Sequence, residues 1–143
     1  MEKKNTLSPS EWRLMECLWD QSPRTIAQLT AELAGEKGWG KHTIISFLNR
    51  MEAKGAVTYR EEGRAKAYLP AFPREEATRK EAGRFLDRVF GGSLRLMVNS
   101  MVEGDDITEE DIRELEDMLA KAKEKTEAKK KAEAEAKGEG SDG

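Results

Sequence analysis

The sequence predicts a mostly α-helical protein with a small β hairpin. Three observations support this fold class. Residues 41–54 form an amphipathic helical pattern, residues 57–69 form a strand, a charged turn and a second strand, and two capping motifs upstream mark the starts of two earlier helices. Two helices joined by a turn to a third helix, which a β hairpin follows, make up a winged helix-turn-helix.

The pattern of residues 41–54 divides one helix into two unlike faces. At 100° per residue, Ile44, Phe47, Leu48 and Met51 gather on one arc that can be buried. The opposite arc shares short polar or small side chains, with a cationic neighbour on its flank: His42, Ile45, Ser46, Asn49, Ala53 and, on the flank, Arg50. Base edges in a DNA major groove require such donors, acceptors and methyl contacts.

The hairpin signal begins where that helix stops. Gly55 supplies the left-handed residue that ends a helix, and Val57 and Tyr59 then alternate with polar neighbours at the strand period of two. Residues 61–64 have the length of a hairpin turn, with glycine at Gly63 where positive φ is expected. Pro70 ends the returning strand. An amphipathic helix packed on any small hairpin remains the alternative interpretation.

Two capping boxes predict the upstream helices. Ser8 with Glu11 opens the first helix, and Pro9 occupies its first turn. Thr25 with Gln28 opens a second, short helix. Residues 35–38 form the turn into the helix of residues 41–54, so the spacing is that of a helix-turn-helix.

These elements predict a DNA-binding surface. We expect His42 and Ser46 to read base edges, Ile45 to contact a thymine methyl, and Arg64 at the hairpin turn to contact the DNA backbone or minor groove. The expected DNA-binding residues are Lys41, His42, Thr43, Ile45, Ser46, Asn49, Arg50, Arg60, Arg64 and Lys66. Two alternatives stay open: the arginines of the hairpin pair with Glu61 and Glu62, or the domain binds a protein through its third helix and has no operator.

Residues 74–90, 93–103 and 108–119 are each expected to be helical, with much apolar surface in short segments. One chain of this length cannot bury all of it, so a two-fold partner is the economical solution, ahead of folding back onto the first domain. The expected dimerisation residues are Phe85, Val89, Leu94, Met97, Val98, Met101, Val102, Leu115 and Met118. The predicted domains are residues 1–72, residues 73–125 and a charged, disordered tail of residues 126–143. Two alternatives stay open: Glu/Lys pairs prolong the last helix past Lys121, and Lys129 to Lys131, which are expected to be solvated, contact DNA.

Composition sets the remaining limits. Charged residues make up 37% of 143 residues and the mean hydropathy is −0.78, with no apolar run long enough for a membrane span. The net charge of −3 is uneven, because residues 1–72 carry eleven cations and nine acids, a formal charge of +2. With no signal-like N-terminus and a single cysteine, a cytoplasmic location is expected.

Catalysis, cofactors and metals have little support in the sequence. Cys17 lies among apolar residues of the first helix, which is typical of a buried core thiol. His42 is the only histidine, so no His/Cys ligand set exists. We expect no enzyme activity, no cofactor and no metal site.

The chain resembles the penicillinase-repressor family, the BlaI/MecI/CopY group of bacterial winged-helix repressors. The resemblance covers about residues 7–120 and depends on the order and spacing of several motifs together. These are Ser10-Glu11-Trp12 with Met15 and Trp19, Trp39 with Thr43-Ile44, Leu48-Asn49-Arg50-Met51, Lys54-Gly55, Gly63-Arg64, Tyr68, the run from Phe85 to Gly92, and Met97-Val98.

The resemblance implies a homodimeric transcriptional repressor that binds double-stranded DNA at dyad operators with TACA/TGTA-like half-sites. It also implies a membrane sensor metalloprotease as a partner, but Ser100-Met101 stands where the β-lactam-responsive members have an Asn-Phe cleavage site. The paired Cys-x-Cys motifs of the copper-responsive members are missing. Gly40-Lys41-His42 replaces a common Ser-Pro-Lys, so the operator preference is expected to be shifted.

Overall fold

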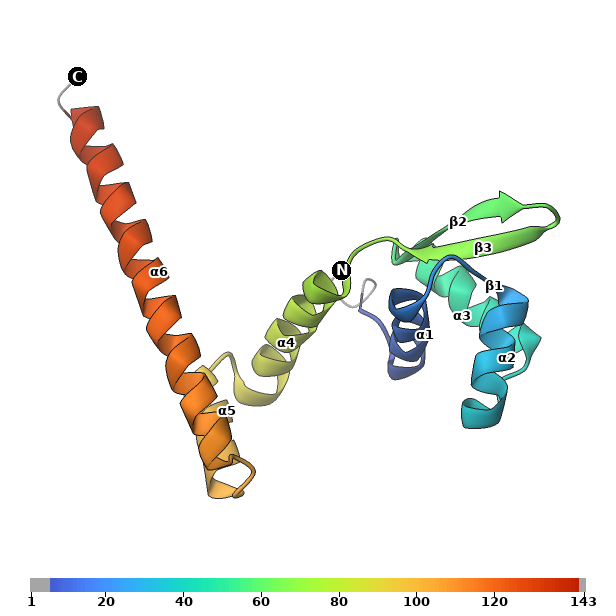
Figure 1. Ribbon diagram of the computed structural model, residues 1–143, viewed down its shortest axis with the longest axis horizontal. Helices are drawn as coiled ribbons and strands as arrows, with labels where there is room; N and C mark the ends of the chain where they lie inside the picture. Colours follow the sequence, from blue (N-terminus) through green and yellow to red (C-terminus); the bar gives the residue numbers. More distant parts are fainter. Residues whose placement is uncertain (1–5, 142–143) are drawn as a thin grey trace. The chain divides into compact units, whose positions relative to one another are not determined.

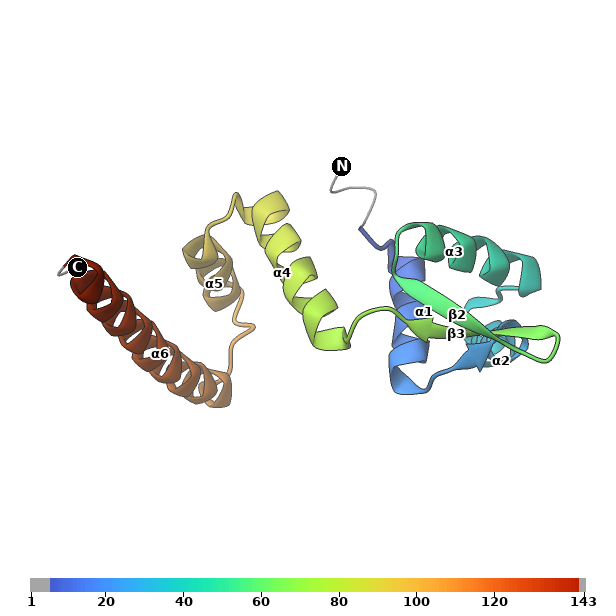
Figure 2. The same ribbon diagram turned by 90° about the horizontal axis from the view of Figure 1, so that it is seen from above.

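The computed structural model describes residues 6–141, and the chain divides into two compact units, Met1–Arg84 and Phe85–Gly143. Six helices and a three-stranded antiparallel sheet make up the described part, so the predicted fold class is confirmed (Figures 1 and 2). The elements are α1 (Pro9–Asp20), β1 (Arg24–Thr25), α2 (Ile26–Lys37), α3 (Lys41–Ala53), β2 (Val57–Glu62), β3 (Ala65–Pro70), α4 (Arg74–Phe90), α5 (Leu94–Glu103) and α6 (Glu109–Ser141). None of these helices is long and apolar enough to cross a membrane.

The helix starts follow the sequence signals. Ser8 caps α1 and Thr25 caps α2, and in both cases the reciprocal hydrogen bonds of a capping box are formed. Gly38 ends α2 with a φ of 69°, and Gly55 follows α3 with a φ of 77°. At both positions the backbone is left-handed, a conformation that carries no steric penalty for glycine. The two glycines therefore end α2 before α3 begins and end α3 before β2.

The sheet has the strand order β1-β3-β2. In the β2–β3 hairpin Glu62 pairs with Ala65, so Gly63 and Arg64 form a two-residue turn, with Gly63 at a φ of 65°. Sequence reasoning missed β1, in which Arg24 pairs with Tyr68 and Thr25 with Ala67. A strand of two residues has no period to detect, and here it ties the start of α2 to the hairpin.

A single core of buried side chains holds unit 1 together. It draws on all three N-terminal helices and on both hairpin strands: Leu14, Met15, Cys17, Leu18, Leu29, Leu33, Ile44, Leu48, Met51, Ala56, Val57 and Tyr68. Trp19 extends this core, because its indole nitrogen donates to the carbonyl of Phe72 at 3.0 Å. That bond fastens the segment between β3 and α4 to α1.

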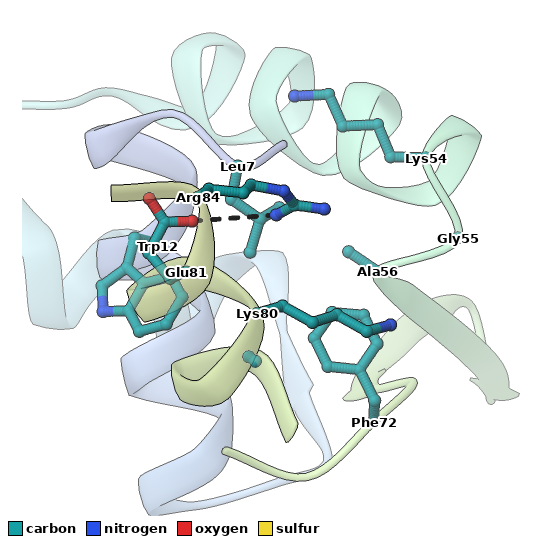
Figure 3. A pocket seen from close by; sticks show the side chains of 10 residues that line it. Leu7, Trp12, Lys54, Gly55, Ala56, Phe72, Lys80, Glu81 and Arg84 are labelled. Carbon is teal, nitrogen blue, oxygen red and sulfur yellow. Dashed lines mark ion pairs between the residues drawn. The ribbon is translucent and has the colours of Figure 1, made fainter. Parts of the chain in front are cut away.

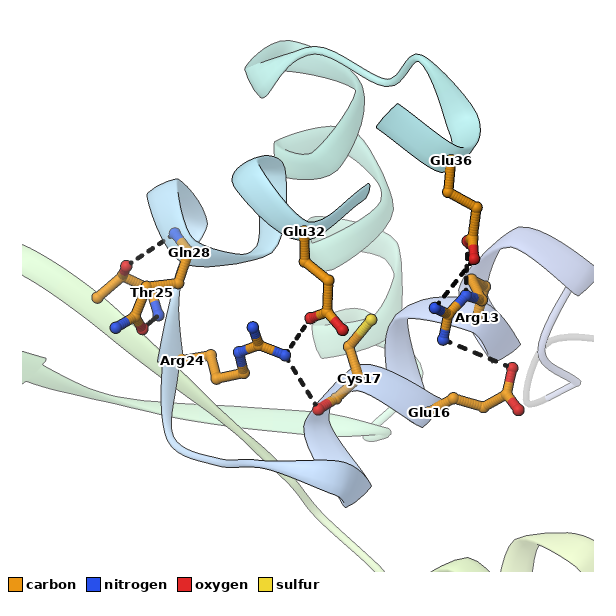
Figure 4. A network of polar contacts seen from close by, with 8 residues as sticks. All are labelled: Arg13, Glu16, Cys17, Arg24, Thr25, Gln28, Glu32 and Glu36. Carbon is orange, nitrogen blue, oxygen red and sulfur yellow. Dashed lines mark hydrogen bonds and ion pairs between the residues drawn. The ribbon is translucent and has the colours of Figure 1, made fainter. Parts of the chain in front are cut away.

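Two ion pairs join α2 to its neighbours (Figure 4). Arg13 of α1 donates to both carboxylate oxygens of Glu36 in α2, at 2.7 and 3.2 Å, and this lowers the pKa of the Glu36 carboxyl. Arg24 of β1 pairs with Glu32 and also donates to the carbonyl of Cys17 at 3.4 Å. The C-terminal half of α2 is therefore fixed relative to α1 and β1.

The start of α1 and the end of α3 are joined by a buried ion pair. The Nζ of Lys54 lies 2.6 Å from Oε1 of Glu11 and 2.8 Å from the carbonyl oxygen of Thr6. Glu11 is 1% exposed, and its other carboxylate oxygen is buried with no hydrogen-bond partner among the described residues. Burial alone would raise the pKa of Glu11, but the hydrogen bonds from Lys54 and Ser8 outweigh burial and lower the pKa.

Unit 2 is built differently, because it has no core of its own. From Phe85 to Lys137 no described residue is fully buried, and many large apolar side chains of α4, α5 and α6 are exposed. A capping box of Thr108 and Asp111 is present before α6. The predicted domain boundaries at 72/73 and 125/126 stay predictions, since the two units meet within α4.

The structure differs from the predicted disordered tail of residues 126–143. Helix α6 continues to Ser141, and residues 142–143 lie outside the described part. Alanine, lysine and glutamate are strong helix formers, and Glu/Lys residues three or four positions apart support a helix that is polar on all sides. In this segment helix propensity prevails over a composition that is typical of disorder.

We expect Lys54→Met to lower the free energy of unfolding by about 3 kcal/mol at pH 7, because it leaves the buried Glu11 carboxylate unpaired. The pKa of Glu11 is lower in the folded chain than its ordinary value of 4.5, so its ionised form contributes stability above that pH. This contribution is lost as the pH falls through the folded pKa, so the difference between wild type and variant should shrink in acid. Urea unfolding at pH 7 and pH 4 measures both effects.

The control is Lys41→Met, which removes an exposed lysine that has no ion pair among the described residues and should change stability by at most about 0.5 kcal/mol. Equal losses for the two variants at pH 7 would show that the Glu11–Lys54 pair does not anchor α3.

Candidate nucleic-acid interface

Helix α3 presents the polar arc that its sequence pattern predicts. Ile44, Leu48 and Met51 are fully buried in the core of unit 1. The side chains on the other side are exposed, except for Ile45, which is half-buried: His42, Thr43, Ser46, Asn49 and Arg50. The structure therefore brings six of the predicted DNA-binding residues together on one exposed surface.

Aromatic contacts fix the two flanks of α3. The ring of Trp39, just before the helix, lies 5.0 Å from the ring of Phe47, and the guanidinium of Arg50 lies 5.7 Å from the same Phe47 ring. Gly40 at the N-cap makes no side-chain cap bond, so the first backbone N–H groups of α3 are left for another acceptor.

The β2–β3 hairpin places its cations in different environments. Arg60 pairs with Glu62 at 3.0 Å, so the alternative of internal pairing applies to this arginine. Lys66 lies over the Tyr59 ring at 4.3 Å, and Arg64 occupies the turn. Within the described residues neither Arg64 nor Lys66 has an acidic partner, so their charges are available to a ligand.

A groove of about 760 Å³ connects the hairpin with the two helices of the helix-turn-helix. Its charged lining consists of Lys41 at the start of α3 with Arg64 and Lys66 of the hairpin. No acidic residue lines it, and none of the three cations forms an ion pair in the part of the chain that is described. We call it the α2–wing groove.

The first turns of α2 form the floor of this groove, and sequence reasoning did not include them in the site. Thr25, Ile26, Ala27, Thr30 and Ala31 contribute small or half-buried side chains. The signal was present, because Ala27, Thr30 and Ala31 are small residues at the spacing of one helix face, directly after the Thr25 cap. The N-terminal end of a helix carries a partial positive charge, which adds to that of the lining cations.

A second cavity in unit 1 differs from the groove because its charges are neutralised (Figure 3). It measures about 280 Å³ and is lined by Trp12, Phe72 and three cations from α3 and α4. Each cation already has a carboxylate partner: Lys54 binds Glu11, Lys80 lies 3.3 Å from Glu76, and Arg84 lies 3.8 Å from Glu81. A ligand would find no unpaired charge there.

Cys17 is 1% exposed, and burial raises the pKa of its thiol to about 11. At neutral pH it is therefore protonated, as is usual for a core thiol. Among the described residues no group of three or more His, Cys, Asp or Glu side chains is placed to hold a metal ion.

In unit 2, all but one of the predicted dimerisation residues are exposed. Met97 is half-buried, and the others are between 40% and 60% exposed: Phe85, Val89, Leu94, Val98, Met101, Val102, Leu115 and Met118. Leu96, Ile112 and Leu119 are exposed as well and were not in the predicted set.

Comparison with known proteins gives consistent matches. The profile of the penicillinase repressor family matches residues 7–121. The penicillinase repressor of Bacillus licheniformis is 30% identical over 125 residues, which span 87% of this chain and 98% of that protein. The methicillin resistance regulatory protein MecI of Staphylococcus aureus (strain N315) is 24% identical over 119 residues, 83% of this chain and 97% of MecI.

Among solved structures, the solution structure of the DNA binding domain of the repressor BlaI is 29% identical, with a TM-score of 0.47, and the match covers 53% of this chain and 93% of that domain. The family profile covers most of the chain, from the cap of α1 into α6, and the Bacillus licheniformis relative aligns over nearly its whole length. The chain therefore belongs to the penicillinase repressor family.

Proposed function

We propose that this chain is a sequence-specific DNA-binding transcriptional repressor that acts in the cytoplasm as a homodimer on dyad operators. The observation that carries the proposal is the α2–wing groove, where Lys41, Arg64 and Lys66 lie beside the exposed arc of α3 with no acidic partner among the described residues. Unpaired cations beside a polar helix face suit phosphate contacts next to base contacts. Family membership supports the same function, since the relatives are named as repressors.

In this proposal α3 lies in the major groove. His42 and Ser46 hydrogen-bond to base edges, and Ile45 contacts a thymine methyl group. Thr43, Asn49 and Arg50 hold phosphates or the flank of the site. All six side chains come from the exposed surface of α3, and the exposure of Ser46 and Asn49 leaves their polar groups free to reach a ligand.

The DNA backbone would follow the α2–wing groove. A phosphate near Thr25 and Ala27 would face the positive end of α2 and the ammonium group of Lys41. Arg64 contacts the backbone or minor groove from the other wall, and Lys66 supports it. Arg60 contributes less, because Glu62 already neutralises part of its charge.

The homodimer follows from the exposed apolar surface of unit 2. Burying a large aliphatic side chain stabilises a fold by about 1.5–3 kcal/mol, and the described part of unit 2 buries none completely. A second copy of the chain would bury these exposed apolar side chains. Two DNA-binding units on one dimer make the second contact intramolecular, which raises avidity about 10²–10⁴-fold.

Proteolytic induction is not part of the proposal. The Ser100-Met101 bond lies inside α5, where the amide of Gly104 donates to the carbonyl of Ser100 at 3.2 Å. A protease would need this helix to open before it could cleave the bond.

The direct test is footprinting of the full-length protein on DNA upstream of its own gene. A protected dyad site supports the repressor. The competing function is a winged-helix module that binds a protein through Ile45. DNA binding should weaken steeply with salt, whereas an apolar protein interface should not.

Ser46→Ala should cost about 1–3 kcal/mol at one base position of the operator and relax the preference there, because one hydrogen bond to a base edge is lost. Binding to a panel of single-base operator variants measures this. Thr43→Ala is the comparison, and its loss should be the same on every sequence. A uniform loss for Ser46→Ala would make Ser46 a positioning residue.

Arg64→Ala should weaken binding to all DNA and reduce the slope of log K against log salt by about one unit, because one phosphate contact is removed. Arg60→Ala removes the same charge from the same hairpin, but its slope should change less because Arg60 is paired with Glu62. Titrations at several salt concentrations measure both slopes. An unchanged slope for Arg64→Ala would contradict a phosphate contact.

Met97→Asp should convert the dimer to monomers, because a carboxylate would be placed in an apolar interface. Sedimentation equilibrium at micromolar concentration measures this, with circular dichroism as a check of folding. Asn99→Asp introduces the same group on the opposite side of α5 and should leave the dimer intact. A dimer that tolerates Met97→Asp would exclude this interface.

A further inference from the structure

We propose that α6 pairs antiparallel with α6 of a second copy, and that Lys123 and Lys125 of each copy set the register by facing Glu109 and Asp111 of the other. This inference rests on the proposed homodimer and specifies how its longest helices meet. The argument starts from the charge distribution along α6 and from its apolar stripe.

Charge is segregated along α6. Residues 109–117 contain six acidic residues and one arginine, whereas residues 121–131 contain six lysines and two glutamates. The helix macrodipole favours acids near the N-terminus, but its effect on cations is limited to the last turn. Residues 121–131 end well before Ser141, so the dipole does not account for them.

The lysines of this basic segment have no acidic partner in the described part of the chain. No side chain of α6 takes part in an ion pair of the structure, among the residues whose side chains are described. The acids near the start of α6 are equally unpaired, although Asp111 accepts a hydrogen bond from the amide of Thr108 through Oδ2. Both charged segments are therefore exposed and complementary in sign.

An apolar stripe lies between the two charged segments and overlaps them. Ile112, Leu115 and Leu119 lie on one face at helical spacing and are 46%, 41% and 64% exposed, and Ala122 continues the same face. A stripe this exposed on a helix of unit 2 requires an apolar partner.

The stripe fixes the register of an antiparallel pair. When the stripes of two copies coincide, Leu115 lies opposite Leu119 and Ile112 lies opposite Ala122. In that register Lys123 lies next to Glu109 of the second copy, and Lys125 lies next to its Asp111. Each lysine–acid pair lies beside the apolar stripe, and the two-fold axis generates a second copy of each pair.

A parallel pair would have the opposite energetics. The acidic segments of residues 109–117 would face each other along the interface, and so would the basic segments, and like charges at such spacing repel. The charge pattern therefore selects the antiparallel orientation. Lys123 and Lys125 lie beyond residue 121, where the match to the family profile ends.

The first test is the salt dependence of dimerisation in full-length protein. The double variant Lys123→Glu/Lys125→Glu should raise the dimer dissociation constant at low salt at least about tenfold, because attraction becomes repulsion at four symmetric positions. Added salt should weaken the wild-type dimer and strengthen that of the variant, since screening reduces both effects. Sedimentation equilibrium at 50 mM and 500 mM salt measures the change of sign.

Two controls isolate the pairing. Lys131→Glu/Lys137→Glu makes the same charge change further along α6, past the overlap, and should leave the dissociation constant nearly unchanged. Combining Lys123→Glu with Glu109→Lys swaps one pair and should recover most of the affinity that Lys123→Glu loses alone. A failure of the swap to recover affinity would contradict the register.

Disulfide trapping decides the orientation. A mixture of the single variants Ile112→Cys and Ala122→Cys should form a mixed disulfide on mild oxidation, whereas neither variant alone should form one. A parallel pair would give the reverse result, because each position would then meet itself. The natural Cys17 is buried and should form no disulfide. Oxidation of the wild-type protein checks this, and circular dichroism checks that the variants stay folded.

The outcomes separate this inference from the proposed function. A wild-type protein that sediments as a monomer would remove the homodimer itself. A stable dimer with neither the salt reversal nor the mixed disulfide would keep the homodimer and overturn the α6 pairing. If Lys123→Glu/Lys125→Glu leaves the dimer intact but weakens DNA binding, these lysines contact DNA, and the pairing is likewise wrong.

Discussion

The position of α3 depends on one buried ion pair. Lys54 stands at the end of α3 and Glu11 in the first turn of α1, so the contact between Nζ and Oε1 at 2.6 Å joins elements far apart in sequence. The same Glu11 closes the capping box with Ser8. One carboxylate therefore starts α1 and fixes the end of α3. Oε2 of Glu11 has no hydrogen-bond partner among the described residues, so loss of Lys54 would leave this buried carboxylate without a charge partner.

Other contacts in unit 1 determine which side of α3 is exposed and where α2 lies. The apolar arc of α3 packs into the core, so the polar arc has one possible orientation. Strand β1 holds the start of α2 against β3, and the ion pairs of Arg13 and Arg24 hold the body of α2. The α2–wing groove is therefore bounded by elements that are each fixed by hydrogen bonds or ion pairs.

The fold class could be predicted because its signals are local, and the family could be predicted because several motifs keep their order and spacing along the chain. Capping boxes, Gly55, Gly63 and the two arcs of α3 are each readable within a few residues, and the structure has them where expected. The contribution of α2 to the groove could not be predicted, because it arises where β1, α2 and the hairpin meet. The length of α6 could not be predicted, because its charged composition is typical of disorder whereas its Ala, Lys and Glu residues favour a helix. The DNA-binding and dimerisation residues remain predictions, placed on exposed surfaces.

A unit without buried side chains has a further consequence for how such a protein responds to its own abundance. In the proposed homodimer, the burial of the apolar side chains of residues 85–138 comes from association, so the stability it provides follows mass action and grows with the concentration of the chain. The N-terminal unit has its own buried core, so its stability does not depend on association. Diluting the proposed homodimer would therefore loosen the C-terminal unit and leave the N-terminal unit folded, and occupancy of the proposed operator would fall more steeply than the protein concentration itself.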